Sequence, residues 1–334
     1  MIKNYLGIEI GSRALKVVVC ERGAIKKVFI ERIPEGIVEN DRIVNWVEMT
    51  EVLKRTLQKD KLRCKDVALV IPEGLTYVRK ITMPYMTEPQ LRFNLPFEFH
   101  DFISGNKEDY IYDYALIKVN EPNASGERTM EIMASAMAIE DFENYEKMIK
   151  ACKLKLRIAV PESVAYQNIV KKYLNMRPEK QGKDFAILNM GYGAINLRIY
   201  TDGVYETGKE IKPGIAPIYD ILRNKYQIDD WKQCNKMKLQ EALEDPECME
   251  VYGRFALDIM RVMSFFHYNH PNNTLTTLYC CGRGLSINPL KDTIRDTVGI
   301  KVEGLYELFS DICYDEKAMV YGAAGAGVTW NEEV

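Results

Sequence analysis

The chain has 334 residues, of which 47% are hydrophobic and 28% charged, and its formal net charge at pH 7 is −3. These values are ordinary for a globular protein of about two domains. They exclude the strongly basic surface of a nucleic-acid-binding protein. No run of 18 or more apolar residues occurs, so we expect no transmembrane segment.

The cysteines and histidines predict no metal site. The eight cysteines include no C-x-x-C pair, and the only closely spaced histidines, His267 and His270, have no acidic or thiol partner at ligand spacing. Free thiols in apolar segments fit a reducing compartment. No signal-like segment precedes the first strand-like run, so we expect a cytoplasmic protein.

The first 80 residues predict the element order βββαβ. The segments 5–10, 14–20 and 25–33 are apolar or alternating and are separated by turns, which is typical of a three-stranded meander. Apolar residues at helical spacing follow between 43 and 57. The continuous apolar run at 67–71 indicates a strand buried on both faces.

Residues 84–150 differ in character and predict a small α+β insert. Three prolines punctuate an aromatic stretch at 93–102, a strand-like segment begins at 110, and a turn at 121–126 precedes a second strand at 129–137. A helix is expected over 142–149. The strand at 156–160 then returns to the first lobe, and a helix begins at Pro161-Glu162-Ser163.

The second half repeats the opening pattern about 180 residues later. Strands are expected at 187–190, 195–200 and 204–211, followed by helices at 213–226, 230–243 and 249–268. A strand at 275–281, a short strand at 300–303 and a helix of small residues at 317–328 close the chain. The repetition indicates the duplication of a whole lobe.

The first glycine turn is a candidate phosphate-binding element. Gly11 and Ser12 follow Glu9, and Lys16 comes on the next strand. Such a turn presents backbone N–H groups to an anion, glycine lets the backbone approach closely, and Lys16 is placed to reach a phosphate. An acid at position 9 would hold a hydrated magnesium ion. Taken alone, the turn fits a plain β-hairpin better, but two further glycine turns favour a binding site.

Those further turns also follow strand-like runs. They contain Asn189, Gly191, Tyr192 and Gly193 in one, and Gly282, Arg283 and Gly284 in the other. Together the motifs resemble those of the actin-like ATPase superfamily and, within it, the PilM family of type IV pilus assembly proteins, over essentially the whole chain. Met83-Pro84, the aromatic stretch and the segment at 109–114 sharpen the resemblance to PilM.

The resemblance implies a fold of the α/β class. It comprises two actin-like lobes, duplicated from a ribonuclease-H-like unit, with a small α+β insert in the first lobe. The implied boundaries are 1–82 and 152–182 for the first lobe, 83–151 for the insert, 183–212 and 272–334 for the second lobe, and 213–271 for a helical subdomain of the second lobe.

The resemblance also implies an ATP site between the lobes, with or without magnesium. Its expected residues are Glu9, Gly11, Ser12, Arg13, Lys16, Asn189, Gly191, Tyr192, Gly193, Lys238, Gly282, Arg283 and Gly284. Lys238 is included because it follows Asp230 on a predicted helix, where the superfamily's connecting motif often carries a nucleotide-contacting lysine.

Several departures from the superfamily pattern predict a degenerate site with no catalytic residue. Glu9 stands where the family has Asp, and Asn189 also replaces an Asp, which removes a charge expected to orient magnesium and water. Asn235 replaces the connecting motif's Glu, Cys281 replaces a glycine, and Arg13 is bulkier than usual. We therefore expect ATP to act as a structural ligand that is hardly hydrolysed.

The implied function is that of a cytoplasmic scaffold, peripheral to the membrane, in the type IV pilus assembly platform. It would bind the N-terminal tail of a bitopic PilN-like protein in a groove between the first lobe and the insert. The candidate groove residues are Glu73, Tyr77, Met83 and Phe93. Contact with the pilus motor ATPase is also implied, and the oligomeric state stays open. The aromatic stretch is more simply the insert's own core.

Two alternatives are kept. One is an active actin-like ATPase or a sugar-kinase-like phosphotransferase. Either enzyme needs a metal-binding acid opposite Glu9, where this chain has Asn189, and the kinase also needs a catalytic base. The other is an FtsA-like cell-division protein, which needs an amphipathic membrane helix; residues 329–334 are too short and too acidic to form one.

Overall fold

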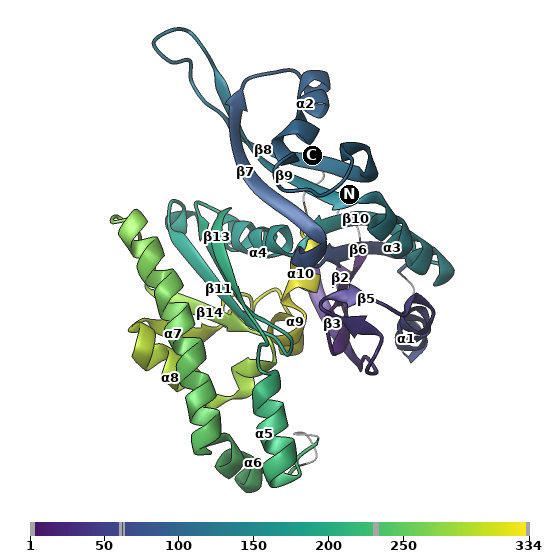
Figure 1. The fold of residues 1–334 in the computed structure, drawn as a ribbon, viewed down its shortest axis with the longest axis vertical. Helices are drawn as coiled ribbons and strands as arrows, with labels where there is room; N and C mark the ends of the chain where they lie inside the picture. Colours follow the sequence, from purple (N-terminus) through teal and green to yellow (C-terminus); the bar gives the residue numbers. More distant parts are fainter. Residues whose placement is uncertain (1–3, 60–61, 63, 230–233, 332–334) are drawn as a thin grey trace.

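The computed structural model describes residues 4–59, 62, 64–229 and 234–331. The start of the helix expected at 230, and residues 332–334 of the acidic last segment, lie outside this described part. Figure 1 shows two lobes side by side with the insert above them.

The first lobe is built on a five-stranded sheet with strand order β10-β6-β1-β2-β3. Strand β1 pairs antiparallel with β2 and parallel with β6, so the predicted βββαβ order is confirmed. The elements are β1 Tyr5–Ile10, β2 Ala14–Glu21, β3 Ala24–Arg32, β4 Val38–Glu39, β5 Arg42–Ile43, α1 Trp46–Lys59, β6 Asp66–Ile71, β10 Lys155–Pro161 and α4 Glu162–Met176.

The second lobe repeats this arrangement in a five-stranded sheet of order β13-β12-β11-β14-β15. Strand β11 pairs antiparallel with β12 and parallel with β14, as β1 does with its two neighbours, so the predicted duplication is confirmed. The elements are β11 Asp184–Met190, β12 Ile195–Thr201, β13 Val204–Ile211, α5 Ala216–Tyr226, α6 Lys236–Leu243, α7 Pro246–Asn269, β14 Thr277–Cys281, α8 Asn288–Val298 and β15 Lys301–Gly304.

The insert has its own three-stranded sheet, of order β7-β9-β8. Strand β7 begins before residue 83, where the sequence suggests that the insert starts, and it runs in Figure 1 from the junction with the lobes to the top of the insert. The elements are β7 Thr76–Pro84, α2 Glu88–Asn94, β8 Tyr110–Val119 and β9 Thr129–Ala138. Helix α3 Ile139–Ala151 follows β9 and buries Tyr145, Met148 and Ile149 in the core of the first lobe.

The helix expected over 317–328 is two helices, α9 Glu316–Tyr321 and α10 Ala323–Val328, which are separated at Gly322. The break lets α10 enter the centre of the molecule, where its small residues meet the backbone of other elements. A Cβ atom on Gly7 of β1 would lie 1.8 Å from the carbonyl oxygen of Gly325. The glycines therefore permit a contact that no other residue would allow.

The lobes share a hydrophobic core, because Tyr166 of α4 and Tyr200 of β12 are buried in one cluster with residues of α9 and α10. Among the described residues, no helix combines the length and the apolar character needed to cross a bilayer.

Candidate functional site

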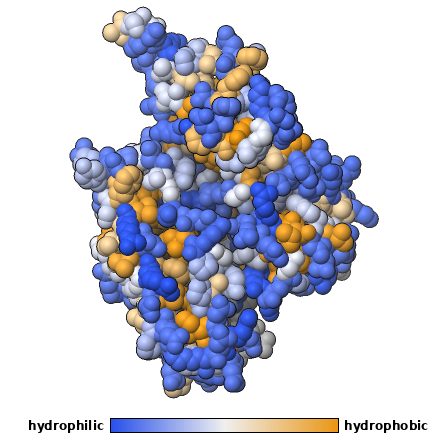
Figure 2. All heavy atoms as spheres, viewed as in Figure 1, coloured by the Kyte–Doolittle hydropathy of each residue, from blue (hydrophilic) through white to orange (hydrophobic). Residues whose placement is uncertain are grey.

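A cavity of about 600 Å³ lies between the two lobes and brings most of the predicted nucleotide-site residues together. Those that line it are Glu9, Gly11, Ser12, Arg13, Lys16, Asn189, Gly191, Tyr192, Gly193, Gly282 and Arg283. Figure 2 shows hydrophilic residues across the middle of the face on which the lobes and the insert meet. Segments about 180 residues apart thus converge, as the sequence predicts.

Two expected residues do not line the cavity. Gly284 is buried, and a Cβ atom there would lie 2.6 Å from Cβ of Met190, so its small size serves packing. Lys238 is exposed on α6, whereas its neighbour Leu239 faces the cavity. Asn235 caps α6, since its side chain accepts a hydrogen bond from the Met237 N–H group at 2.9 Å.

The two phosphate-type turns have the same backbone closure and face each other. The Gly11 N–H group donates to Ala14 O at 3.0 Å, and the Gly191 N–H group donates to Ala194 O at 2.9 Å. A Cβ atom on Gly193 would lie 2.8 Å from Ser12 Oγ. The turns are therefore in direct contact, and glycine is what allows it.

Glu9 and Lys16 neutralise each other at the base of the first turn. They are opposite in the β1–β2 register, and the Lys16 ammonium group donates to Glu9 Oε1. The other carboxylate oxygen accepts a hydrogen bond from the Gly325 N–H group at 3.3 Å. Lys16, expected at a phosphate, is thus held by the acid expected at magnesium.

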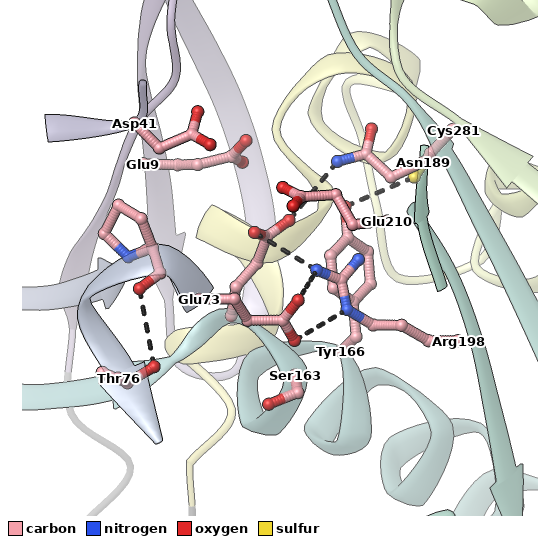
Figure 3. A network of polar contacts seen from close by, with 12 residues as sticks. Glu9, Asp41, Glu73, Thr76, Ser163, Tyr166, Asn189, Arg198, Glu210 and Cys281 are labelled. Carbon is pink, nitrogen blue, oxygen red and sulfur yellow. Dashed lines mark hydrogen bonds and ion pairs between the residues drawn. The ribbon is translucent and has the colours of Figure 1, made fainter. Parts of the chain in front are cut away.

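A buried arginine, which the sequence analysis missed, links the lobes (Figure 3). Arg198 of β12 donates to both carboxylate oxygens of Glu73, at 3.2 and 2.8 Å, and lies 3.3 Å from Glu162 Oε2. Its guanidinium carbon lies 5.0 Å from the ring centroid of Tyr166. Asn189 Nδ2 donates to Glu162 Oε1 at 3.4 Å. An arginine within an apolar strand, and a glutamate directly after Pro161, were the available sequence signals.

Glu162 has a strongly shifted pKa. Burial raises its pKa to about 7, and the carboxylates of Glu73 and Glu9 add to that rise, whereas Arg198 opposes it. A buried, titrating carboxyl group at a cavity wall is a feature of functional sites.

Aromatic rings and guanidinium groups line one side of the cavity. Arg13 Nη2 lies 3.4 Å from the Tyr192 hydroxyl, and the Arg13 guanidinium carbon is 5.0 Å from that ring's centroid. The Tyr192 ring packs edge-on against Tyr219 at 5.2 Å, and Arg283 lies 5.5 Å from the centroid of Tyr219. The Arg13–Tyr192 contact joins the two turns.

The described residues are a poor fit for a magnesium ion at the turns. In this part of the chain, no group of three or more His, Cys, Asp or Glu side chains could hold a metal. Glu9 is already paired with Lys16, and Asn189 carries no charge. Magnesium prefers charged oxygen ligands at near-octahedral positions. The two turns offer it no free carboxylate, so they do not supply such ligands.

The four candidate groove residues lie in different surroundings. Glu73 lines the inter-lobe cavity, and Met83 is buried in the core of the insert. Tyr77 is half-buried on β7, and Phe93 on α2 is 72% exposed. The aromatic stretch is only partly core, because Phe99 is fully buried whereas Phe93, Phe97 and Phe102 are exposed.

Comparison with known proteins agrees with this architecture. A chain of a "PilM-PilN type IV pilus biogenesis complex" superposes with a TM-score of 0.79 at 16% identity, over 98% of both chains. The ethanolamine utilization protein EutJ from Carboxydothermus hydrogenoformans gives 0.60 at 12% identity, over 98% of this chain and 89% of that one. At such identities these matches show the fold alone, and they confirm the actin-like α/β fold.

The family is established separately. No curated protein matches the chain. A model of the family described as type IV pilus assembly protein PilM matches residues 7–320, which is most of the chain. The chain therefore belongs to the PilM family of type IV pilus assembly proteins.

Proposed function

We propose that this protein is a cytoplasmic scaffold at the inner face of the cell membrane, where it binds the N-terminal tail of a bitopic PilN-like protein. Family membership carries the proposal. The structural relative that is named for a complex with PilN supports it. That family match also favours pilus assembly over the FtsA-like alternative. Contact with the motor ATPase is an expectation from the resemblance.

The proposed groove lies where the insert meets the first lobe. Strand β7 follows β6 through the short turn at Glu73–Leu75, and it is an edge strand of the insert's sheet. An edge strand offers N–H and C=O groups to an extended peptide. The rings of Phe93 and Phe97 lie 5.9 Å apart on the insert's exposed surface and would hold apolar side chains of the tail.

Fluorescence anisotropy with a labelled tail peptide of the PilN-like protein tests this assignment. We expect Phe93→Ser together with Phe97→Ser to weaken binding at least about tenfold, the loss typical of an aromatic anchor. Phe265→Ser is the matched control, because Phe265 is 67% exposed on α7 of the other lobe. Equal affinities for all three proteins would overturn the proposed groove.

We also propose that the inter-lobe cavity holds ATP as a structural ligand with little hydrolysis. The paired Glu9 and the neutral Asn189 support this part, since neither supplies a free metal-orienting carboxylate. Calorimetric titration with ATP and a parallel phosphate-release assay test it. Binding without release is the expected result, and steady release would contradict the proposal.

One observation favours the second candidate, an active ATPase. Glu162, with a pKa raised to about 7, lies at the cavity wall and has the properties of a general base. If the protein hydrolyses ATP, phosphate release should fall by about 10²-fold or more in Glu162→Gln. Release that is equal in both proteins would exclude Glu162 as that base.

A further inference from the structure

The phosphate end of the inter-lobe cavity has an unusual charge distribution for a nucleotide site. The first turn's acid is neutralised within its own hairpin, because Glu9 pairs with Lys16 and with the Gly325 N–H group. The second turn's corresponding position is the neutral Asn189, which donates to Glu162. Neither turn therefore presents a free carboxylate to a metal ion, or an unpaired lysine to a phosphate.

Arg13 is a cation that contacts both turns. It directly follows Ser12 of the first turn, and its guanidinium group contacts Tyr192 of the second. It also forms an ion pair of 2.9 Å with Glu35, whose side chain is 66% exposed. Such an exposed pair is weak, so the guanidinium group is able to leave Glu35 for a stronger anion.

A guanidinium group suits the phosphates of a nucleotide. It keeps its charge at any physiological pH and donates several parallel hydrogen bonds to phosphate oxygens. The adjacent N–H groups of the Gly11–Ser12 turn provide the complementary backbone donors. A magnesium ion would instead need oxygen ligands that the two turns do not leave free.

We propose, on the basis of the nucleotide site proposed above, that this cavity binds the phosphates of ATP without a divalent cation. The Arg13 guanidinium group supplies the positive charge that the metal supplies in other nucleotide sites. Arg13 is thereby a specificity residue for the β- and γ-phosphates, and binding of the adenosine part of ATP is independent of it.

Calorimetric titration of the full chain with ATP, once with magnesium and once with EDTA, tests the metal dependence. We expect the two dissociation constants to agree within about threefold. A tenfold difference would correspond to about 1.4 kcal/mol of binding free energy. An affinity that falls tenfold or more in EDTA would overturn the inference and leave the proposed nucleotide site intact. No binding in either condition would overturn the nucleotide part of the proposed function, and the inference with it.

Variants of Arg13 test its role separately. We expect Arg13→Gln to weaken ATP binding at least about tenfold in both conditions, to leave AMP binding unchanged, and Arg13→Lys to restore part of the loss. Arg55→Gln is the charge-matched control, because Arg55 is exposed on α1, away from the cavity. Equal losses for ATP and AMP in Arg13→Gln would show a role in folding only and would overturn the assignment to Arg13.

Discussion

The glycine turns of the two lobes have the same backbone hydrogen bond but carry different charges. Glu9 of β1 lies opposite Lys16 of β2, and at the corresponding positions Asn189 of β11 lies opposite Asn196 of β12. The first lobe thus closes an ion pair within one hairpin, and the second has a neutral pair. In the second lobe the nearby charged residue of this strand is Arg198, two residues after Asn196 on β12.

The charged residues near the two turns therefore have different roles: one ion pair lies within a single hairpin, and the other connects the two lobes. The Glu9–Lys16 pair is formed by neighbouring strands, whereas Arg198 binds Glu73 and Glu162 of the other lobe. A duplicated sheet can therefore keep its geometry while one copy stabilises its own turn and the other connects the two lobes. Breaking the Arg198 cluster should affect the whole molecule more than changes at the first turn.

The largest effect is expected from Arg198→Met, which removes the buried cation and leaves Glu162 buried without it. Removing one partner of a buried ion pair costs about 3–5 kcal/mol of the free energy of unfolding. Urea denaturation measures this loss. Arg261→Met is the control, because Arg261 is exposed in an ion pair with Asp258 on α7, and it should change stability by about 0.5 kcal/mol or less. Similar small losses in both variants would show that Arg198 does not join the lobes.

A pH dependence should follow from Glu162. Its pKa is raised from 4.5 to about 7 in the folded protein, so its contribution to stability is fully present below pH 4.5 and is lost as the pH rises through 7. The loss amounts to about 3 kcal/mol, since one pKa unit corresponds to about 1.4 kcal/mol. Urea denaturation at several pH values should show this loss in the natural protein relative to Glu162→Gln. Parallel curves would contradict the shifted pKa.

A smaller loss of stability is expected from a substitution in β1 at a position where the corresponding strand of the second lobe, β11, carries a large side chain. Gly7 of β1 corresponds to Ile187 of β11, and Gly7→Ala would place a Cβ atom against the Gly325 carbonyl group of α10. We expect a loss of about 1–3 kcal/mol, the usual cost of overpacking, measured by thermal denaturation. Gly253→Ala is the matched control, because a Cβ atom there meets nothing within 4 Å on α7. It should be neutral or stabilising by up to about 1 kcal/mol.

Much of the fold could be predicted from the sequence, because the strands of both sheets carry long apolar runs between glycine turns. Strand β7 was missed because Arg79 and Lys80 interrupt its pattern and much of it is only half-buried. The division between α9 and α10 was missed because small residues at 322–327 suit either a helix or a close backbone contact.

The sequence predicted which residues line the cavity better than it predicted which of their side chains form ion pairs and hydrogen bonds with each other. The glycine turns identified eleven of the cavity's residues. The Glu9–Lys16 pair could have been inferred from hairpin register, since both residues flank the Gly11 turn. The Arg198 cluster could not, because Glu73 is 125 residues away from it in sequence and only the packing of the lobes brings them together.

The position of α10 also has a consequence for the order in which the protein matures on the ribosome. Helix α10 packs against β1, β2 and β6, and its Gly325 N–H group completes the hydrogen bonding of Glu9, 316 residues earlier. Domains commonly fold as they emerge during synthesis. Because residues 323–328 cover the sheet of the first lobe, we expect nascent chains that lack them to expose this face of the sheet to chaperones and proteases.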